Sequence, residues 1–287
     1  MSNAGILIIG NAGMLGRELV AECARRGADA RSLDGPSELD ITDADAVSVM
    51  LRRQEPAVVI NATGYTDVDG AETNPGEADR INATGPGNLA RVCRDLDCTL
   101  VHFSTDYVFD GRAGRPYLAQ DQPNPINAYG RSKLAGERAI VESGCRHLLI
   151  RTSWLFAAHG RNFVRTILAA AGRKPVLNVV NDQHGRPTYC PDLARMTLDL
   201  VDRDVHGTYH AANDGHCTWF DMATAIVNVA GSPCEVHPCP TSAYPLPAPR
   251  PAFSVLDLSA TTALLGPPRH WTDAVADCVG QLIPAGA

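Results

Sequence analysis

The sequence predicts an α/β fold in which a doubly wound parallel sheet is followed by a smaller C-terminal part. The first observation is that short apolar segments alternate with helical segments of about ten residues or more, as in parallel sheets covered by helices on both faces. The second is the position of Gly10, Gly13 and Gly16 between the first apolar segment and the first helix. Glycines at this place permit a tight turn and close packing of the helix on the strand.

The regular alternation occupies the first 150 of the 287 residues. Short apolar runs predict strands at 6–9, 28–33, 57–61, 99–103 and 147–152. Helical periodicity predicts helices at 18–26, 43–53, 77–96 and from residue 127 onward, the third of them broken near Gly85-Pro86-Gly87. The connections between the parallel strands are expected to be right-handed crossovers.

Beyond residue 152 the alternation loosens. Helices are expected at 162–171, 192–202, 219–230, 258–265 and 272–282, and short strands at 175–180 and 207–212. The proline-rich stretch 233–251 is expected to be a loop. We therefore divide the chain into residues 1–150, which form the sheet, and residues 151–287, which cover the strand ends and return in part to the sheet.

The composition excludes several classes of protein. With 45% hydrophobic and 20% charged residues, the chain has the composition of an ordinary globular protein. Its net charge of −7 argues against a nucleic-acid partner. Because no apolar run approaches the ~18 residues that span a bilayer, we expect no membrane association. The N-terminus lacks the features of a signal peptide, and residues 1–4 resemble an expression scar or a disordered start.

The nine cysteines occur without a Cys-x-x-Cys motif. An odd number of cysteines in a chain of this size favours reduced thiols, so we expect a cytoplasmic protein. Cys234, His237 and Cys239 lie close together, but the prolines among them and the lack of a second ligand pair argue against a metal site.

The glycine turn predicts a Rossmann-like, dinucleotide-binding domain in residues 1–150. The turn follows a strand and opens a helix, so its backbone can approach a pyrophosphate that the free N–H groups of the helix then bind. A plain strand–helix turn is the alternative. The expected cofactor contacts in the turn are Gly10, Asn11, Ala12, Gly13, Met14 and Leu15.

Residues after the second and third strands extend this expected cofactor site. Asp34 ends the second strand, where an acid accepts hydrogen bonds from the ribose hydroxyls of NADH. Arg17 and Arg31 can instead meet the 2′-phosphate of NADPH, so the cofactor is NADPH or NADH. Asp40 and Ile41 are expected beside the adenine, unless Asp40 only caps the following helix. The small residues that would let the cofactor pass along the strand ends are Ala62, Thr63 and Gly64.

Tyr129 and Lys133 are the candidate catalytic pair. Asn127 is a suitable N-cap, and the spacing of four places both side chains on one helix face, one turn apart. Because a free phenol titrates near ~10, a neighbouring ammonium is expected to lower the pKa of Tyr129 toward the working range. Such a pair can donate a proton to a carbonyl oxygen as a hydride reaches the carbonyl carbon. An ordinary surface pair is the alternative.

Thr105 and Asp106 directly follow the fourth strand. In an open parallel sheet, ligands bind outside the carboxyl ends of the strands. We therefore expect Thr105 to donate a hydrogen bond to a substrate carbonyl, the alternative being that both residues only form a turn. The glycine turn, these two residues and the Tyr–Lys pair occur in the order that one reductase site would require.

The chain resembles the extended short-chain dehydrogenase/reductase family and, within it, the dTDP-4-dehydrorhamnose reductases. The resemblance runs over most of the length. The segments that carry it are 10–16, 104–111, 129–136, 151–154, 181–188 and 250–257, of which the last two are more specific to these reductases.

The resemblance implies reduction of the C4 ketone of a dTDP-sugar, dTDP-4-dehydro-6-deoxy-L-mannose, to dTDP-L-rhamnose by NADPH or NADH. It implies that Tyr129 is the general acid and that Lys133 is its electrostatic partner, both residues also contacting the cofactor. Thr105 would donate to the carbonyl, and Asp106 would help to hold the sugar. The expected substrate contacts are Thr105, Asp106, Trp154, Asn162, Phe163 and Arg250.

Departures from related patterns narrow the expected chemistry. Dehydratases of the family carry an Asp-Glu pair after the Thr, whereas Tyr107 follows Asp106 here, which favours simple carbonyl reduction. Some family members hold a divalent metal at a dimer contact. Glu18 matches one of the residues that bind this metal, but Pro191 stands where another acid is expected. We therefore predict no metal. A homodimer is compatible with the resemblance.

Two other functions remain open. The regulatory subunit of methionine adenosyltransferase is similar to this family and binds a cofactor without reducing a ketosugar. A nucleotide-sugar epimerase would instead hold NAD tightly and consume none of it.

Overall fold

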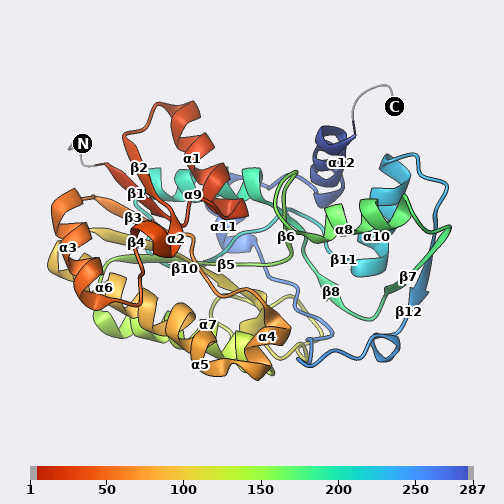
Figure 1. Ribbon diagram of the computed structural model, residues 1–287, viewed down its shortest axis with the longest axis horizontal. Coiled ribbons are helices and arrows are strands. Elements are labelled where there is room, and N and C mark those ends of the chain that lie inside the picture. Colours follow the sequence, from red (N-terminus) through yellow and green to blue (C-terminus); the bar gives the residue numbers. More distant parts are fainter. Residues whose placement is uncertain (1–4, 284–287) are drawn as a thin grey trace.

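Six parallel strands form the central sheet, in the order β10-β5-β4-β3-β1-β2 (Figure 1). The computed structural model describes residues 5–283, so residues 1–4, read above as a scar or a disordered start, lie outside it. The strands are β1 (Ile6–Ile9), β2 (Ala30–Leu33), β3 (Val58–Asn61), β4 (Thr99–Thr105), β5 (His147–Thr152) and β10 (Gly207–His210). The predicted α/β fold with a Rossmann-like parallel sheet is confirmed.

Helices cover both faces of this sheet because successive strand residues point to opposite sides and both sides are apolar. Leu7 and Ile8 of β1 are both buried, each in a different hydrophobic cluster. One face carries α1 (Met14–Arg26), α9 (Cys190–Asp202) and α11 (Ser259–Leu265). The other face carries α3 (Ala44–Gln54), α6 (Gly85–Asp95) and α7 (Ala128–Ser143).

The helix predicted to break near Gly85-Pro86-Gly87 does not break, so that expectation is wrong. It runs through α5 (Pro75–Asp79), a π-helical turn (Arg80–Thr84) and α6. Pro86 has no N–H to donate to the carbonyl of the preceding turn, and the wider π-turn accommodates this without ending the helix. Two short helices were not predicted, α2 (Gly35–Glu38) and α4 (Val68–Thr73).

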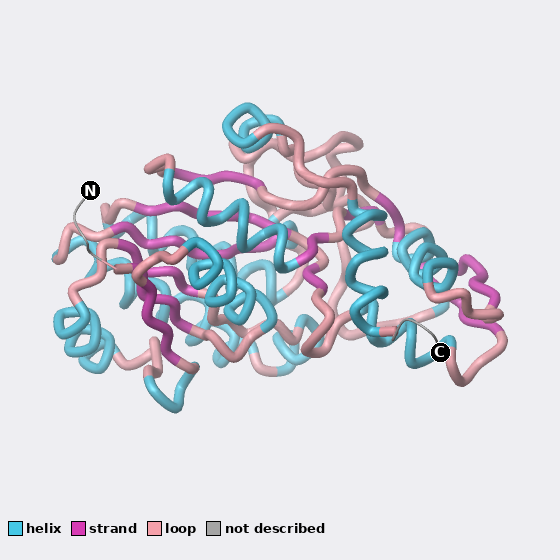
Figure 2. The backbone as a smooth tube through the Cα atoms, turned by 90° about the horizontal axis from the view of Figure 1, so that it is seen from above, coloured by secondary structure: helices cyan, strands magenta, loops and turns pink. Residues whose placement is uncertain are grey.

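A smaller lobe stands beyond the carboxyl ends of the strands, at the right of Figure 1. Its helices α8 (Phe163–Ala171), α10 (Trp219–Val229) and α12 (Trp271–Leu282) enclose a separate apolar cluster. Figure 2 shows the same separation from above, with the sheet nearer the N-terminus and this lobe nearer the C-terminus. Two short ladders lie outside the central sheet: β6 (Leu155–Phe156) pairs with β9 (Thr188–Tyr189), and β8 (His184–Gly185) pairs with β11 (Cys217–Thr218).

Part of the proline-rich stretch is a strand, which corrects the expectation of a loop over 233–251. Segment β12 (Glu235–Cys239) pairs in parallel with β7 (Val176–Val180). Pro238 is tolerated because β12 has only this one partner, and an edge strand does not need every N–H in a ladder. A short 3-10 helix, η3 (Thr241–Ala243), follows it.

None of the helices within residues 5–283 combines the length and the apolar character that crossing a membrane requires.

Candidate functional site

A cleft of about 520 Å³ opens at the carboxyl ends of the central strands. It is lined by the N-terminus of α1, the loop after β3, the ends of β4 and β5, and the first turns of α7. Trp154 and Trp219 close it on the side of the smaller lobe. The cleft therefore lies where a doubly wound sheet binds ligands.

The glycine turn forms the floor of one end of the cleft. Gly10 has a φ of +92°, which a residue with a side chain rarely adopts, and a Cβ on Gly16 would overlap the carbonyl oxygen of Gly10. Gly13 is the N-cap of α1, and neither a capping side chain nor an acid in the first turn satisfies the exposed N–H groups. Because Gly13, Met14 and Leu15 line the cleft, these donors are available to an anion there.

Only some of the remaining residues of the expected cofactor site line the cleft. Ala62, Thr63 and Gly64 line the cleft. Asn11 lies beside the turn, where its Nδ2 donates to Ser32 Oγ at 2.9 Å, and the carbonyl of Ala12 accepts from Arg17 at 3.2 Å.

Three of the residues predicted to contact the cofactor do not line the cleft: Asp34, Asp40 and Ile41. Asp34 is exposed at the end of β2. Asp40 accepts hydrogen bonds from the backbone and hydroxyl of Thr42, which lower the pKa of its carboxyl. Ile41 is buried against Gly85 in the core between the sheet and α6.

Tyr129, Lys133 and Thr105 converge in the cleft. Asn127 caps α7 as predicted, since its side chain accepts from the backbone N–H of Gly130 at 2.7 Å. The absent side chain of Gly130 lets the start of α7 approach the carbonyl of Tyr107, just past β4. This close packing brings the phenol of Tyr129 to the hydroxyl of Thr105, with which it forms a hydrogen bond.

The predicted effect of Lys133 on Tyr129 is wrong for the protein alone. Burial raises the pKa of Tyr129 to about 12, and the hydrogen bond with Thr105 only partly opposes this. The ammonium does not compensate because Lys133 Nζ donates to the carbonyl of Phe103 at 2.7 Å and is itself buried. Tyr129 is therefore held in its protonated form, which is the form that a proton donor requires.

Asp106 is a carboxyl of the cleft whose pKa is shifted far from its ordinary value. It accepts hydrogen bonds from Thr105, at 3.0 Å, and from Ser254, and both favour the carboxylate. Burial outweighs them and raises the pKa of Asp106 to about 7. At neutral pH this side chain can therefore either donate or accept a proton.

The shifted pKa of Asp106 predicts a specific pH dependence of stability. The folded pKa lies above the unfolded value, so between about pH 4 and pH 7 the folded state binds more protons and stability falls as the pH rises, by about 1.4 kcal/mol for each pKa unit. We expect Asp106→Asn to remove this dependence. Chemical denaturation of both proteins from pH 4.5 to 8 (roughly the window that linkage defines) checks it. Parallel stability curves for the two proteins would contradict the assignment.

Two hydroxyls of the cleft have no partner among the described residues. Ser104 Oγ and Thr152 Oγ1 are buried at the ends of β4 and β5, line the cleft and form no hydrogen bond. A buried polar atom without a partner is costly, so such atoms point to a ligand or a water. Both lie in the segments 104–111 and 151–154 that carry the family resemblance, but nothing in the sequence showed that they would lack partners.

An aromatic wall closes the cleft at the smaller lobe. Trp154 has a φ of +48° and stacks on Trp219 with ring centroids 3.5 Å apart and planes 8° from parallel. Gly185 lies under Trp154, where a Cβ would overlap the indole, and Phe163 packs against Trp219 with a centroid separation of 4.6 Å. Trp219 was missed, because it starts a helix of the second part and only the fold brings it to Trp154.

Asn162 and Arg250 are held by protein groups. Asn162 caps α8, accepting from Arg165 N at 3.2 Å and donating to the carbonyl of Ala157 at 2.8 Å. Arg250 forms a two-pronged ion pair with Asp69 at 2.6 and 2.7 Å. Neither lines the cleft, whereas Arg161, which was not predicted, does.

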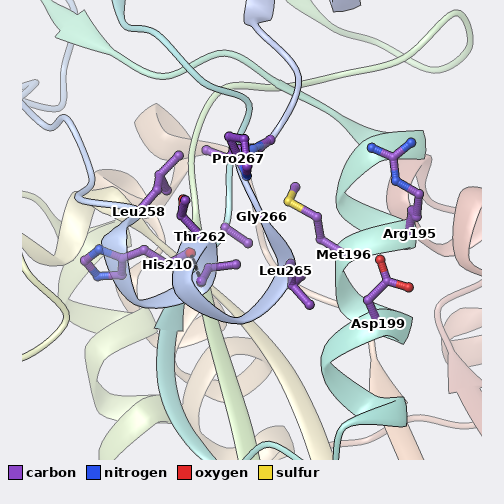
Figure 3. A pocket seen from close by; sticks show the side chains of 13 residues that line it. Arg195, Met196, Asp199, His210, Leu258, Thr262, Leu265, Gly266 and Pro267 are labelled. Atoms are coloured by element: carbon purple, nitrogen blue, oxygen red, sulfur yellow. Dashed lines mark hydrogen bonds between the residues drawn. The ribbon is translucent and has the colours of Figure 1, made fainter.

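A second cavity lies between α9 and α11, beside the end of β10 (Figure 3). In Figure 3, Met196 extends from α9 toward Gly266 and Leu265. The cavity measures about 60 Å³, which is too small for a nucleotide. The cleft, which Thr105, Tyr129 and Lys133 line, is the candidate active site.

The residues weighed as metal ligands do not form a cluster. Glu18 pairs with His159 at 2.6 Å, and residues 5–283 contain no group of three or more His, Cys, Asp or Glu side chains placed to hold a metal. All nine cysteines are free thiols.

Comparisons with known proteins agree on one family. The family model for the RmlD substrate binding domain matches residues 4–283. A dTDP-4-dehydrorhamnose reductase of Mycolicibacterium smegmatis is 42% identical over 98% of this chain and 86% of that protein. The crystal structure of a dTDP-4-dehydrorhamnose reductase from Clostridium acetobutylicum is 37% identical, with a TM-score of 0.93, and covers 97% of this chain and 99% of its own. That of a Bacillus anthracis dTDP-4-dehydrorhamnose reductase in complex with NADP is 34% identical, with a TM-score of 0.91, covering 96% and 98%.

Proposed function

The chain belongs to the RmlD substrate binding domain family, and from this membership we propose that it reduces the C4 ketone of dTDP-4-dehydro-L-rhamnose to dTDP-L-rhamnose. It is an oxidoreductase that uses NADPH or NADH, and its substrate is a dTDP-sugar. The observation that carries the proposal is the convergence of Tyr129, Thr105 and Lys133 in one cleft with the glycine turn.

The cleft fits a dinucleotide, whose role when bound is to supply the hydride. The uncapped N-terminus of α1 suits its pyrophosphate, and the buried hydroxyls of Ser104 and Thr152 are unused donors for a polar group at the strand ends. We propose that the contacts are those predicted from the sequence, with Asp34 and Asp40 at the outer edge of the site and the buried Ile41 supporting this edge from the core. In this division, residues 1–150 bind the dinucleotide and residues 151–287 mainly bind the sugar nucleotide.

Three side chains of the chain perform the proton chemistry in this proposal. Tyr129 Oη donates its proton to the carbonyl oxygen, and the hydroxyl of Thr105, which otherwise donates to Asp106, turns to donate a hydrogen bond to the same oxygen. Lys133 supplies positive charge at the moment when the phenolate forms. Asp106 helps to hold the sugar hydroxyls beside them.

The substrate side of the cleft is proposed to use the aromatic wall. The stacked Trp154 and Trp219 indoles line the cleft and offer apolar aromatic surface to a pyrimidine or sugar ring. Arg161, which lines the cleft, is a suitable partner for a diphosphate. Asn162 and Phe163 are proposed to shape this side, and Arg250 to keep the adjoining loop in place through Asp69.

A substitution under the wall tests this assignment. Gly185→Val is expected to displace the Trp154 indole, because even a Cβ at residue 185 overlaps it. We expect KM for the sugar nucleotide to rise about tenfold or more, as for loss of one stacking contact, and the Kd for NADPH to stay within twofold, a change of only about 0.4 kcal/mol. Steady-state kinetics and fluorescence titration measure the two constants. An unchanged KM, or equal losses in both constants, would argue against a substrate role for the wall.

The reaction itself is tested by mixing the protein, a dTDP-ketosugar and each reduced cofactor. Loss of dihydronicotinamide absorbance, in proportion to the ketosugar added, is expected. Comparison of the 4-dehydro-L-rhamnose and 4-dehydro-6-deoxy-D-glucose nucleotides identifies the sugar. A regulatory subunit or an epimerase would leave the absorbance unchanged.

A further inference from the structure

Lys133 has a neighbour that the proposed chemistry does not use. Its Nζ lies 3.3 Å from Nε2 of His102, a residue of β4 that is completely buried. On the other side of the imidazole, Nδ1 lies 3.1 Å from Nδ2 of Asn61, at the end of β3. Asn61, His102 and Lys133 therefore form one buried row that leads from the sheet to the cleft.

The backbone fixes which way the Asn61 amide points. Oδ1 of Asn61 faces the backbone N–H of Thr63 at 3.1 Å and the hydroxyl of the same residue at 2.6 Å. A backbone N–H can only donate, so the atom facing it must be the oxygen. The Nδ2 group, which also can only donate, is thereby turned toward His102.

This orientation fixes the position of the proton on His102. Nδ1 must accept from Asn61, so in a neutral imidazole the proton resides on Nε2. The ring is neutral because burial and the adjacent Lys133 hold the pKa of His102 well below its usual value. His102 therefore presents an N–H, not a lone pair, to Lys133.

An ammonium and an N–H cannot form a hydrogen bond, since both only donate. A neutral amine has a lone pair and can accept from Nε2 while still donating to the carbonyl of Phe103 at 2.7 Å. We propose that Asn61 and His102 are positioning residues that present an N–H to Lys133 and so stabilise the neutral amine left after Lys133 has given up a proton.

The inference rests on the proposed function and adds a step to it. When the Oη–H bond of Tyr129 breaks, its proton goes to the carbonyl oxygen of the substrate. One N–H bond of the Lys133 ammonium then breaks, and that proton restores the phenol. The amine that remains accepts from His102 and is reprotonated later by water from the cleft, so Tyr129 is ready again without leaving a stranded phenolate.

The other charged groups near Lys133 act in different directions. Burial lowers the pKa of Lys133 to about 8, and Glu137 on the same helix opposes this. Glu137 is largely neutralised by Arg151 of β5 at 2.6 Å. Tyr129 on α7 and Asp106 after β4 are titratable groups that line the same cleft as Lys133. His102 is the neighbour whose ring nitrogen lies 3.3 Å from Nζ.

The first test determines directly which ring nitrogen of His102 carries the proton. In protein labelled with ¹⁵N at histidine, the signals absent from His102→Gln identify His102, and their nitrogen shifts distinguish the two neutral forms of the ring. We expect the Nε2–H form between about pH 6 and 9, on both sides of the ordinary histidine pKa. The Nδ1–H form or a charged ring would overturn the inference. If His102→Gln does not fold, a neutron structure of the unaltered protein locates the same proton.

The second test reverses the direction of the hydrogen bonds that run from Asn61 through His102 to Lys133. In Asn61→Asp, a carboxylate oxygen still accepts from Thr63 while the other accepts from His102, which moves the ring proton to Nδ1 and gives Lys133 an acceptor. The ring signals should switch forms, and the fall of kcat at alkaline pH should move to higher pH because the acid dissociation constant of Lys133 drops on the order of tenfold.

A control separates the row from the added negative charge. In Asn61→Asp combined with His102→Gln, the new carboxylate remains but cannot act through the ring. Compared with His102→Gln alone, we expect the alkaline limb to move by less than half as much as in the single variant. An equal movement would show that the charge acts through space, and unchanged ring signals in Asn61→Asp would equally overturn the inference. Failure of the proposed reduction would leave the histidine spectrum of the first test unaffected, so the two failures are distinguishable.

Discussion

Tyr129→Phe is expected to lower kcat for ketosugar reduction by about 10²- to 10⁴-fold, the range for loss of a general acid. The substitution removes only the hydroxyl that meets Thr105 in the cleft, whereas the ring keeps its packing against Tyr107, with centroids 6.0 Å apart. The Kd for NADPH should therefore stay within threefold, a change of roughly 0.65 kcal/mol. The loss should appear in kcat and in kcat/KM together, because the proton is transferred only in the transition state.

Rapid-mixing kinetics with saturating cofactor measures this loss, and fluorescence titration measures cofactor binding. Tyr244→Phe is the matched control, since that phenol donates to the carbonyl of Asn178 at 3.1 Å in the smaller lobe, away from the cleft. Its kcat should equal that of the unaltered protein. A Tyr129→Phe enzyme with nearly full kcat would assign the proton to another group, of which Asp106 is the first to examine.

Arg151→Leu is expected to lower the free energy of unfolding by about 3–5 kcal/mol. Arg151 Nε and Nη2 donate to the two oxygens of Glu137 at 2.9 and 2.6 Å, and both side chains are only 6% exposed. Leucine leaves the Glu137 carboxylate buried without its partner, and that uncompensated charge is the main cost. The effect should be large because this pair joins β5 to α7, the helix that carries Tyr129 and Lys133.

A double-mutant cycle in denaturant isolates this pair. The combination Arg151→Leu with Glu137→Leu should recover a large part of the loss, since two apolar side chains leave no buried charge. Arg115→Leu is the exposed control, because its pair with Asp121 lies at the surface, and it should lower the free energy of unfolding far less than Arg151→Leu does. Additive losses in the cycle would mean that the two charges are not coupled.

The inner strands of the sheet were predictable because they are buried on both faces and are therefore mostly apolar. The predicted strand 6–9 agrees with β1 to the residue, and 147–152 agrees with β5. The errors arose where tertiary partners override local signals. Prolines in 233–251 indicated a loop, but β7 offers an edge on which β12 can pair despite Pro238. Likewise, Gly85 and Pro86 indicated a break that a π-turn accommodates.

The candidate site was predictable where its residues lie in short motifs. Thr105, Tyr129 and Lys133 do line one cleft, because they follow a strand end and begin a capped helix. Trp219 was not predictable, because it meets Trp154 through the packing of two distant segments. The pKa of Tyr129 was predicted in the wrong direction, since spacing along a helix shows a neighbour but not the extent of burial or where an ammonium donates its hydrogen bonds.

The most direct test of the central claim follows the hydride itself. The protein is incubated with the dTDP-4-dehydro-L-rhamnose nucleotide and NADPH carrying deuterium at the transferable position of the nicotinamide, and the product is analysed by mass spectrometry and NMR. If Tyr129, Thr105 and Lys133 act as proposed, the product is dTDP-L-rhamnose with one deuterium at C4, and Tyr129→Phe forms almost none. A sugar nucleotide recovered without deuterium at C4, with the cofactor still reduced, would contradict the account.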